Sequence, residues 1–333
     1  QKIISSEVRN LAKRRNVSRY FESRSAIKKM ENQDFKKLPS LEQLKVIIDE
    51  LNNANFNLVS YNKLVTKLRQ LQFIPFPTAK LNVGYHIERG RINEPGEIFT
   101  SEKELSYRTD YNNITKYGRA NVPHDSLFYG AIESDVIKHP RLINMLETSQ
   151  IFRNLDKEKV DNADFVMTVG KWRIIEEMEI VEIVFNENSI ENSEDVRKSY
   201  QFHLEKLKTD LPDYVDQFEY ILKFFSNQFA KKEINSHLDY MISAAYTDLA
   251  INFRGFPGLK YPSVKSDYMG HNVVLNPRAV DNFLELEIAA MYRITKEKDN
   301  TLISPIAHAT EFGPLNSNFK WVDYEPEKIV VEK

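Results

Sequence analysis

The hydrophobic pattern of the chain changes near residue 80, and this change limits the fold more than any other feature. Before it, apolar residues recur with the 3.6-residue period of helices, as in Leu41, Leu44 and Ile48. After it, short runs typical of strands lie among further helical stretches, at residues 83–87, 127–129, 180–185, 272–275 and 283–288. Strands and helices do not alternate strictly. The sequence therefore predicts an α+β fold with small mixed or antiparallel sheets, flanking helices and a helical N-terminal extension.

The same pattern predicts three regions. Residues 1–77 are expected to be helical, with Ser40 as an N-cap. Residues 78–300 form the predicted main domain, in which residues 186–235 are an expected helical insertion. Residues 301–333, which contain three prolines, are expected to wrap irregularly over that domain. Helices after residue 80 are predicted at 140–152, 195–208, 214–232 and 237–252.

Composition and charge exclude several classes of protein. The 46 Lys and Arg nearly balance the 48 Asp and Glu, for a net charge of −2, so bulk attraction of nucleic acid is not expected. No apolar run approaches the roughly 20 residues that span a bilayer, and no secretory signal is visible. Without cysteine, the chain lacks disulfides, thiol nucleophiles and Cys-based zinc sites. We therefore expect a cytoplasmic protein without membrane contact.

Common cofactor motifs are also absent from the sequence. Neither a Rossmann glycine fingerprint nor a P-loop occurs, and no H-E-x-x-H is present. The seven His are scattered, so no metal site is expected. The stretch Lys13-Arg14-Arg15 lies in a basic arm over residues 1–37. A solvated helical arm is favoured there over an arm that binds nucleic acid or an acidic partner.

Two segments carry polar residues where a plain strand or helix would not need them. In the first, Arg89 and Arg91 flank Gly90 after a predicted strand, which suits a pyrophosphate because Arg grips phosphate oxygens with paired donors. The second, Gly-Arg-Ala-Asn-Val-Pro over residues 118–123, is a predicted turn before the aromatic strand that holds Tyr129. The alternative for the first segment is an ordinary surface loop. The alternative for the second is a structural turn before a buried strand.

The third segment begins at Tyr261-Pro262-Ser263-Val264. Its proline stops helical continuation and places Ser263 at the mouth of a strand, where the hydroxyl binds a ligand or caps a turn. Asn272 follows in Asn-Val-Val-Leu-Asn-Pro. Taken alone, neither role of Ser263 is favoured.

Together and in this order, the segments resemble the RES-domain family, named for an Arg, a Glu and a Ser and known from bacterial toxin–antitoxin pairs with Xre-type antitoxins. The resemblance covers roughly residues 80–295. It rests on Arg-x-Arg after a strand, Gly-Arg-x-Asn-x-Pro before an aromatic-Tyr-Gly-Ala strand, a later helix bearing Leu-Glu, and Pro-Ser followed by Asn-x-x-Leu-Asn-Pro. It implies a fold similar to diphtheria-toxin-like ADP-ribosyltransferases. It also implies NAD as the substrate, with cleavage of the nicotinamide–ribose bond.

The resemblance also assigns site residues. Arg89 corresponds to the family Arg, with Arg91 as a near alternate, and Ser263 corresponds to the family Ser. Tyr129 matches the aromatic position and is expected to pack against nicotinamide or ribose. The predicted NAD-binding set is Arg89, Arg91, Arg119, Asn121, Tyr129, Ser263 and Asn272.

The family Glu is most similar to Glu147 in Met-Leu-Glu. Its distance in sequence from Tyr129 is longer than in shorter members of the family, and Glu133 is a competing carboxylate. A carboxylate in this role stabilises the oxocarbenium-like ribose that remains when nicotinamide departs. The residue pattern leaves both glutamates open.

The resemblance implies an NAD-degrading enzyme, hydrolytic or phosphorolytic, that arrests growth as a toxin or defence effector. One alternative is an ADP-ribosyltransferase that modifies a macromolecule. Another is a non-catalytic scaffold whose basic arm binds a partner. The expected partners are NAD and an antitoxin or other regulatory protein, and a homo-oligomer is compatible with the sequence.

Overall fold

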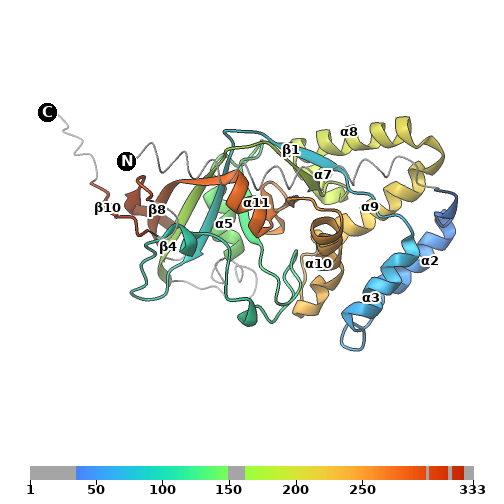
Figure 1. The fold of residues 1–333 in the computed structure, drawn as a ribbon, viewed down its shortest axis with the longest axis horizontal. Helices are drawn as coiled ribbons and strands as arrows, with labels where there is room; N and C mark the ends of the chain where they lie inside the picture. The colour runs from blue at the N-terminus through green and yellow to red at the C-terminus, as the bar shows by residue number, and fades with distance from the viewer. Residues whose placement is uncertain (1–34, 149–161, 298–299, 314–316, 326–333) are drawn as a thin grey trace.

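The computed structural model describes residues 35–148, 162–297, 300–313 and 317–325, which form an α+β fold as predicted (Figure 1). Most of the basic arm and the end of the helix predicted at 140–152 lie outside the described residues. Instead of small sheets, the strands form one ten-stranded sheet in the order β1-β5-β6-β7-β3-β2-β4-β8-β9-β10. Among the described strands, only β5 and β6 pair in parallel.

The strands and helices have the following bounds. The strands are β1 Thr78–Leu81, β2 His86–Ile92, β3 Phe128–Ile132, β4 Asn162–Ile174, β5 Met178–Glu182, β6 Gly258–Pro262, β7 His271–Leu275, β8 Leu284–Glu297, β9 Asn300–Ala309 and β10 Val322–Asp323. The α-helices are α2 Leu41–Asn52, α3 Tyr61–Leu68, α4 Glu102–Leu105, α5 Pro140–Thr148, α7 Glu187–Asn192, α8 Glu194–Asp210, α9 Val215–Phe229, α10 Met241–Asp248 and α11 Pro277–Phe283. Short turns of helix include η6 His237–Tyr240, η8 Val264–Ser266 and the π-helical η7 Leu249–Phe253. None of the described helices is long and apolar enough to cross a membrane.

The expectation of an irregular wrap after residue 300 is wrong for β9. This strand pairs with β8 over most of its length despite Pro305. The register shifts where Met291 is opposite Ala307 and Tyr292 is opposite Pro305, so Ile306 is an extra residue in β9. A proline without an amide proton is tolerated at such a bulge.

Helices α2 and α3, the first α-helices among the described residues, pack into the main body of the protein. Ser40 caps α2 as predicted, through the backbone amide of Gln43. Buried leucines of α2 and α3 share one hydrophobic core with Phe225 of α9 and Tyr246 of α10. Figure 1 shows these four helices grouped at one end of the molecule. The same core continues onto one face of β5, β6 and β7, so the helical N-terminal region and the sheet are a single packing unit.

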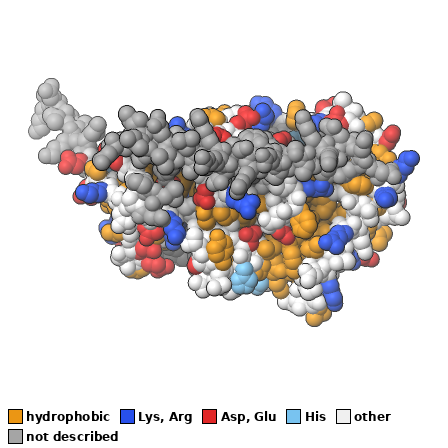
Figure 2. Space-filling view, viewed as in Figure 1, with side chains coloured by type: hydrophobic (Ala, Val, Ile, Leu, Met, Phe, Trp, Pro, Cys, Tyr) orange, Lys and Arg blue, Asp and Glu red, His pale blue; other side chains and the backbone are white. Residues whose placement is uncertain are grey.

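A second hydrophobic core covers the opposite face of the sheet. It joins Ile87 of β2, Phe128 of β3 and Val273 of β7 to the short helix α11. Successive residues of a strand point to opposite faces, so these side chains alternate with those of the first core. In the space-filling view, hydrophobic side chains are visible lower in the picture than the grey band, near the place of α10, a helix of the first core (Figure 2).

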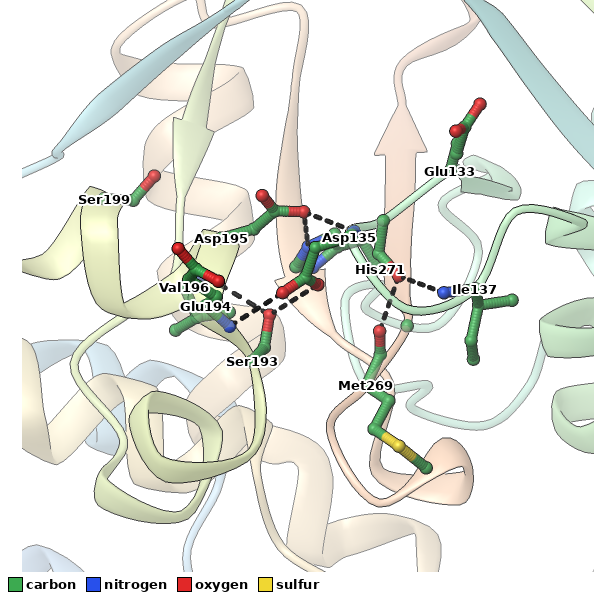
Figure 3. Close-up of polar contacts among 12 residues, drawn as sticks. Glu133, Asp135, Ile137, Ser193, Glu194, Asp195, Val196, Ser199, Met269 and His271 are labelled. Atoms are coloured by element: carbon green, nitrogen blue, oxygen red, sulfur yellow. Dashed lines mark hydrogen bonds and ion pairs between the residues drawn. The ribbon is translucent and has the colours of Figure 1, made fainter.

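The start of helix α8, in the expected insertion, docks on the loop after β3 through polar contacts (Figure 3). The carboxylate of Asp195 accepts the backbone N–H of Asp135 at 2.6 Å, and the carboxylate of Asp135 accepts the backbone N–H of Glu194 at 2.9 Å. The buried His271 ring of β7 lies 3.8 Å from the same Asp195 carboxylate. The insertion thus contacts the strand whose next residue is Asn272.

A buried ion cluster makes a second link between the insertion and the sheet. Glu182 of β5 is 3% exposed, and its carboxylate lies 3.0 Å from His203 Nε2 of α8 and ion-pairs with Lys260 of β6. Burial alone raises the pKa of Glu182, but the hydrogen bond with His203 and the charge of Lys260 together lower it to about 2 from the ordinary 4.5.

We expect Glu182 to make folding sensitive to acid. Its pKa is lower in the folded chain, so its contribution is complete above about pH 4.5 and is lost as the pH falls towards 2. That loss amounts to about 3 kcal/mol of unfolding free energy. Urea unfolding at pH 6 and pH 3 should show a smaller loss in Glu182→Gln than in wild type. Glu177→Gln, at a half-exposed pair with Lys80, should retain the wild-type loss, and equal losses in all three would contradict the assignment.

Candidate active site

Two predicted site residues, Ser263 and Asn272, bind the carboxylate of a third, Glu147. Ser263 Oγ donates a hydrogen bond to Glu147 Oε1 at 2.6 Å, and Asn272 Nδ2 donates to the same oxygen at 3.0 Å. Ser263 is fully buried and Asn272 is 7% exposed. Glu147 lies near the end of α5, Ser263 directly follows β6 and Asn272 is on β7. The structure therefore brings together residues that are more than a hundred positions apart in sequence.

The hairpin between β6 and β7 fixes the two donors. Tyr261 is paired with Asn272 in the ladder, and the amide of Ser263 donates to the carbonyl of Gly270 at 2.8 Å. The connection passes through η8 and two residues with left-handed backbone, Asp267 and Tyr268. The hydroxyl of Ser263 is thus held at the base of a closed turn, where it faces α5.

A glycine permits the close approach of α5 to this hairpin. A Cβ atom on Gly270 would lie 2.5 Å from Ile143 Cδ1, closer than side chains tolerate. Any larger residue would force the buried Ile143 side chain of α5 to move. The scarcity of glycine in this chain makes its use at this contact informative.

Glu133, the competing carboxylate, has a different environment. Its side chain is 59% exposed and forms an ion pair with Lys138 at 3.1 Å. In Figure 3 the side chain points away from the polar contacts around Asp195. This is the ordinary position of a solvated glutamate. Glu147 instead has its orientation set by two buried donors, which is the arrangement expected of a carboxylate with a fixed task.

Tyr129 lies on β3 and organises the predicted turn before it. Its hydroxyl donates to Asn121 Oδ1 at 2.7 Å and accepts the backbone N–H of Ala120 at 3.2 Å. Burial raises the pKa of Tyr129 well above its usual value, so the phenol stays neutral. Asn121 and Tyr129 are therefore brought together as predicted, with the phenol hydroxyl engaged in holding the turn.

We expect Tyr129→Phe to lower the free energy of unfolding by about 1–2 kcal/mol, because Ala120 N–H and Asn121 then lose a buried partner. The measurement is a urea unfolding curve at pH 7. Tyr85→Phe, at a tyrosine that is 62% exposed, is the control and should be unchanged. A Tyr129→Phe variant as stable as wild type would mean that the hydroxyl does not hold the turn.

Arg119 connects the predicted turn to α9. Its guanidinium donates to the backbone carbonyls of Phe229 and Lys231, where α9 ends, and lies 5.0 Å from the ring centre of Tyr240. A cation at the carbonyl end of a helix is electrostatically favourable. The charge of Arg119 lowers the pKa of the buried Tyr261 phenol, and the charge of Glu147 raises it.

Arg89 and Arg91 lie on the other face of the sheet from Glu147. The ladder places Glu88 opposite Ala131, and Ala131 opposite Asn272, so these residues share the face of Glu147. Arg89 and Arg91 follow Glu88 by one and three positions, so they point the opposite way. The guanidinium of Arg91 lies 4.3 Å from the ring centre of Phe99.

The guanidinium of Arg89 binds where β2 and β3 separate. These strands pair only at Glu88 and Ala131. Next to this pair, Arg89 Nη1 donates to the carbonyl of Tyr129 at 2.7 Å and Nε donates to the carbonyl of Ser106 at 3.0 Å. Burial lowers the pKa of Arg89 to about 10, which leaves the side chain charged at neutral pH. The structure thus connects Arg89 to Tyr129 through the backbone and does not pair it with Glu147.

Sequence reasoning missed Tyr261, which belongs to the same cluster. It is 4% exposed. Burial is the main cause that raises its pKa far above the usual value, and electrostatic interactions with Tyr129 and Glu147 raise it further. Strand alternation could have identified it, because residues two apart in a strand share a face and Tyr261 stands two before Ser263.

A pocket of about 240 Å³ lies away from this cluster. It opens between α3 and η7 and is lined mainly by apolar side chains, with Arg69 and Arg254. None of its lining residues belongs to the predicted site.

In the comparisons with known proteins, no family model matches the chain and no similar curated protein is found.

Proposed function

We propose that the protein is a RES-type enzyme that degrades NAD by cleaving the nicotinamide–ribose bond. One observation carries the proposal: Ser263 and Asn272, both from the Pro-Ser to Asn-Pro segment, donate to one oxygen of Glu147. The resemblance points to Ser263 and Asn272, and to Glu147 with Glu133 as the competing carboxylate. Their convergence on one carboxylate supports a common chemical task.

The task is stabilisation of positive charge. When the glycosidic bond breaks, its electron pair moves to the nicotinamide nitrogen, which becomes neutral, and the ribose becomes oxocarbenium-like. A carboxylate fixed by two hydrogen bonds stabilises this cation without having to reorganise. Water or phosphate then adds to the anomeric carbon, and water loses a proton as it does so.

The arginines contribute unequally in this proposal. Arg119 shares the electrostatic surroundings of Tyr261 with Glu147, so it is the arginine proposed to face the NAD diphosphate. A guanidinium has five N–H donors, so contacts to two carbonyls still allow it to bind a phosphate oxygen. Arg89 is proposed to hold the backbone of Tyr129 in place, and Asn121 to contact a ribose hydroxyl.

A role as a cytoplasmic toxin or defence effector, with an antitoxin or other regulatory partner, is part of the same proposal and rests on the resemblance. An ADP-ribosyltransferase fold, and transfer of ADP-ribose to a macromolecule, rest on it equally. The exposed nucleophile of a target protein would then replace water as the acceptor.

The test is incubation of the purified chain with NAD, with and without inorganic phosphate, while nicotinamide and the ribosyl product are followed by chromatography. We expect nicotinamide release in both, with a phosphorylated product only if phosphate is the acceptor. Transfer of label from adenine-labelled NAD onto proteins of a cell extract would favour the transferase. If the chain neither released nicotinamide nor gained thermal stability with NAD, the proposal would be overturned in favour of a binding scaffold.

A further inference from the structure

Glu88 is a buried carboxylate that the proposed reaction does not use. It lies in the middle of β2, between the partners Ala131 of β3 and Lys171 of β4, and it is 7% exposed. A carboxylate in such a place is costly unless polar partners compensate for the lost water. Its main partner is the helix that carries Glu147.

The side chain of Glu88 binds the start of α5. Its Oε2 accepts the backbone N–H of Arg141 at 2.6 Å and lies 3.9 Å from Arg141 Nε. Pro140, the first residue of α5, has no N–H, so Arg141 supplies the first backbone donor of the helix. The first amides of a helix lack partners within it and carry partial positive charge. A strand residue, rather than the preceding loop, supplies the acceptor here.

The backbone of Glu88 binds the same helix a second time. Asn144 Nδ2 donates to the carbonyl of Glu88 at 2.9 Å, and Asn144 is 6% exposed. A Cβ atom on the neighbouring Gly90 would be 3.0 Å from Asn144 Cβ, so helix and strand are in direct contact. Arg141 and Asn144 are three residues apart and lie on one side of α5. One residue of the sheet therefore holds the helix at two points.

These contacts determine where Glu147 lies. Glu147 is one turn beyond Asn144 on the nine-residue α5. Any rotation or sliding of this helix therefore moves the Glu147 carboxylate away from Ser263 and Asn272. We infer that Glu88 is a positioning residue that anchors α5 so that Glu147 faces the breaking bond. The expected effect on catalysis rests on the proposed function. The anchoring of α5 by Glu88 does not depend on it.

The first test compares steady-state nicotinamide release in Glu88→Ala and Glu88→Gln. Glutamine retains an oxygen that accepts the Arg141 N–H, whereas alanine does not. We expect kcat to fall at least tenfold in Glu88→Ala and less than threefold in Glu88→Gln, with KM for NAD within threefold in both. Ile48→Val, in the distant α2, is the control for mild destabilisation and should retain wild-type kcat. A Glu88→Ala enzyme with kcat within twofold of wild type would overturn the positioning role.

The second test does not depend on activity. Hydrogen exchange of backbone amides over residues 141–148, measured at a temperature where every variant is folded, should be faster in Glu88→Ala than in wild type and close to wild type in Glu88→Gln. Unchanged exchange in Glu88→Ala would overturn the anchoring. If exchange responds but wild type releases no nicotinamide, the proposed function fails and the anchor remains.

Discussion

Glu147→Gln should reduce kcat for nicotinamide release by about a hundredfold or more, the scale of losing one electrostatic stabiliser of a transition state. Glutamine has the same size and retains an oxygen that accepts hydrogen bonds from Ser263 and Asn272. The geometry of the cluster therefore survives while its negative charge is lost. Affinity for NAD, measured by calorimetry, should change less than threefold.

The melting temperature of Glu147→Gln distinguishes a catalytic role of the Glu147 charge from a role of this residue in stabilising the fold. Because the hydrogen bonds from Ser263 and Asn272 can still form, we expect the melting temperature of Glu147→Gln to stay at or above that of wild type. A lower melting temperature together with lower activity would indicate that Glu147 supports the fold, since Ser263 is fully buried beside it.

Glu133→Gln is the matched control for Glu147→Gln. This glutamate is 59% exposed and pairs with Lys138, so its loss should leave turnover near normal. If Glu133→Gln were inactive and Glu147→Gln active, the assignment of the carboxylate would be reversed. If both variants released nicotinamide at the wild-type rate, the catalytic proposal would fail.

Local patterns predict the helices of this chain well and the sheet less well. The helix over Leu41–Asn52 has a period and a cap that act within one turn, and both are found in the structure. Strand β4, which the hydrophobic pattern does not reveal, mixes Asp164, Gly170 and Lys171 with apolar residues. Its pairing with β8 depends on residues more than a hundred positions away, and no local pattern encodes such a partner.

The same contrast holds for the candidate site. Residue types and spacing select Ser263 and Asn272, and these meet Glu147. Spacing alone cannot place Arg89, because the face on which a strand residue lies depends on register with its neighbours. Glu88 has no distinguishing signal in the sequence, because its burial and its contact with α5 arise only from packing.

Arg89→Ala should lower the free energy of unfolding by roughly 3 kcal/mol, because it leaves the part-buried carbonyls of Tyr129 and Ser106 without their charged donor. Loss of packing of the guanidinium over Phe128 adds to the effect. Relief from keeping a cation buried, visible in the lowered pKa of Arg89, offsets part of it. Urea unfolding at pH 7 measures the net change.

Arg91→Ala is the matched control, two positions along β2 on the same face of the sheet. Arg91 donates to the carbonyl of Glu104 in an exposed hydrogen bond, whereas the hydrogen bonds of Arg89 are part-buried, so the loss of Arg91 should cost less than about 1 kcal/mol. Arg89→Lys retains the charge without the planar fork that spans two carbonyls, so its stability should be intermediate. A stable Arg89→Ala protein with ten- to a hundredfold weaker NAD binding would show instead that the guanidinium acts mainly on the diphosphate, as the sequence pattern indicates.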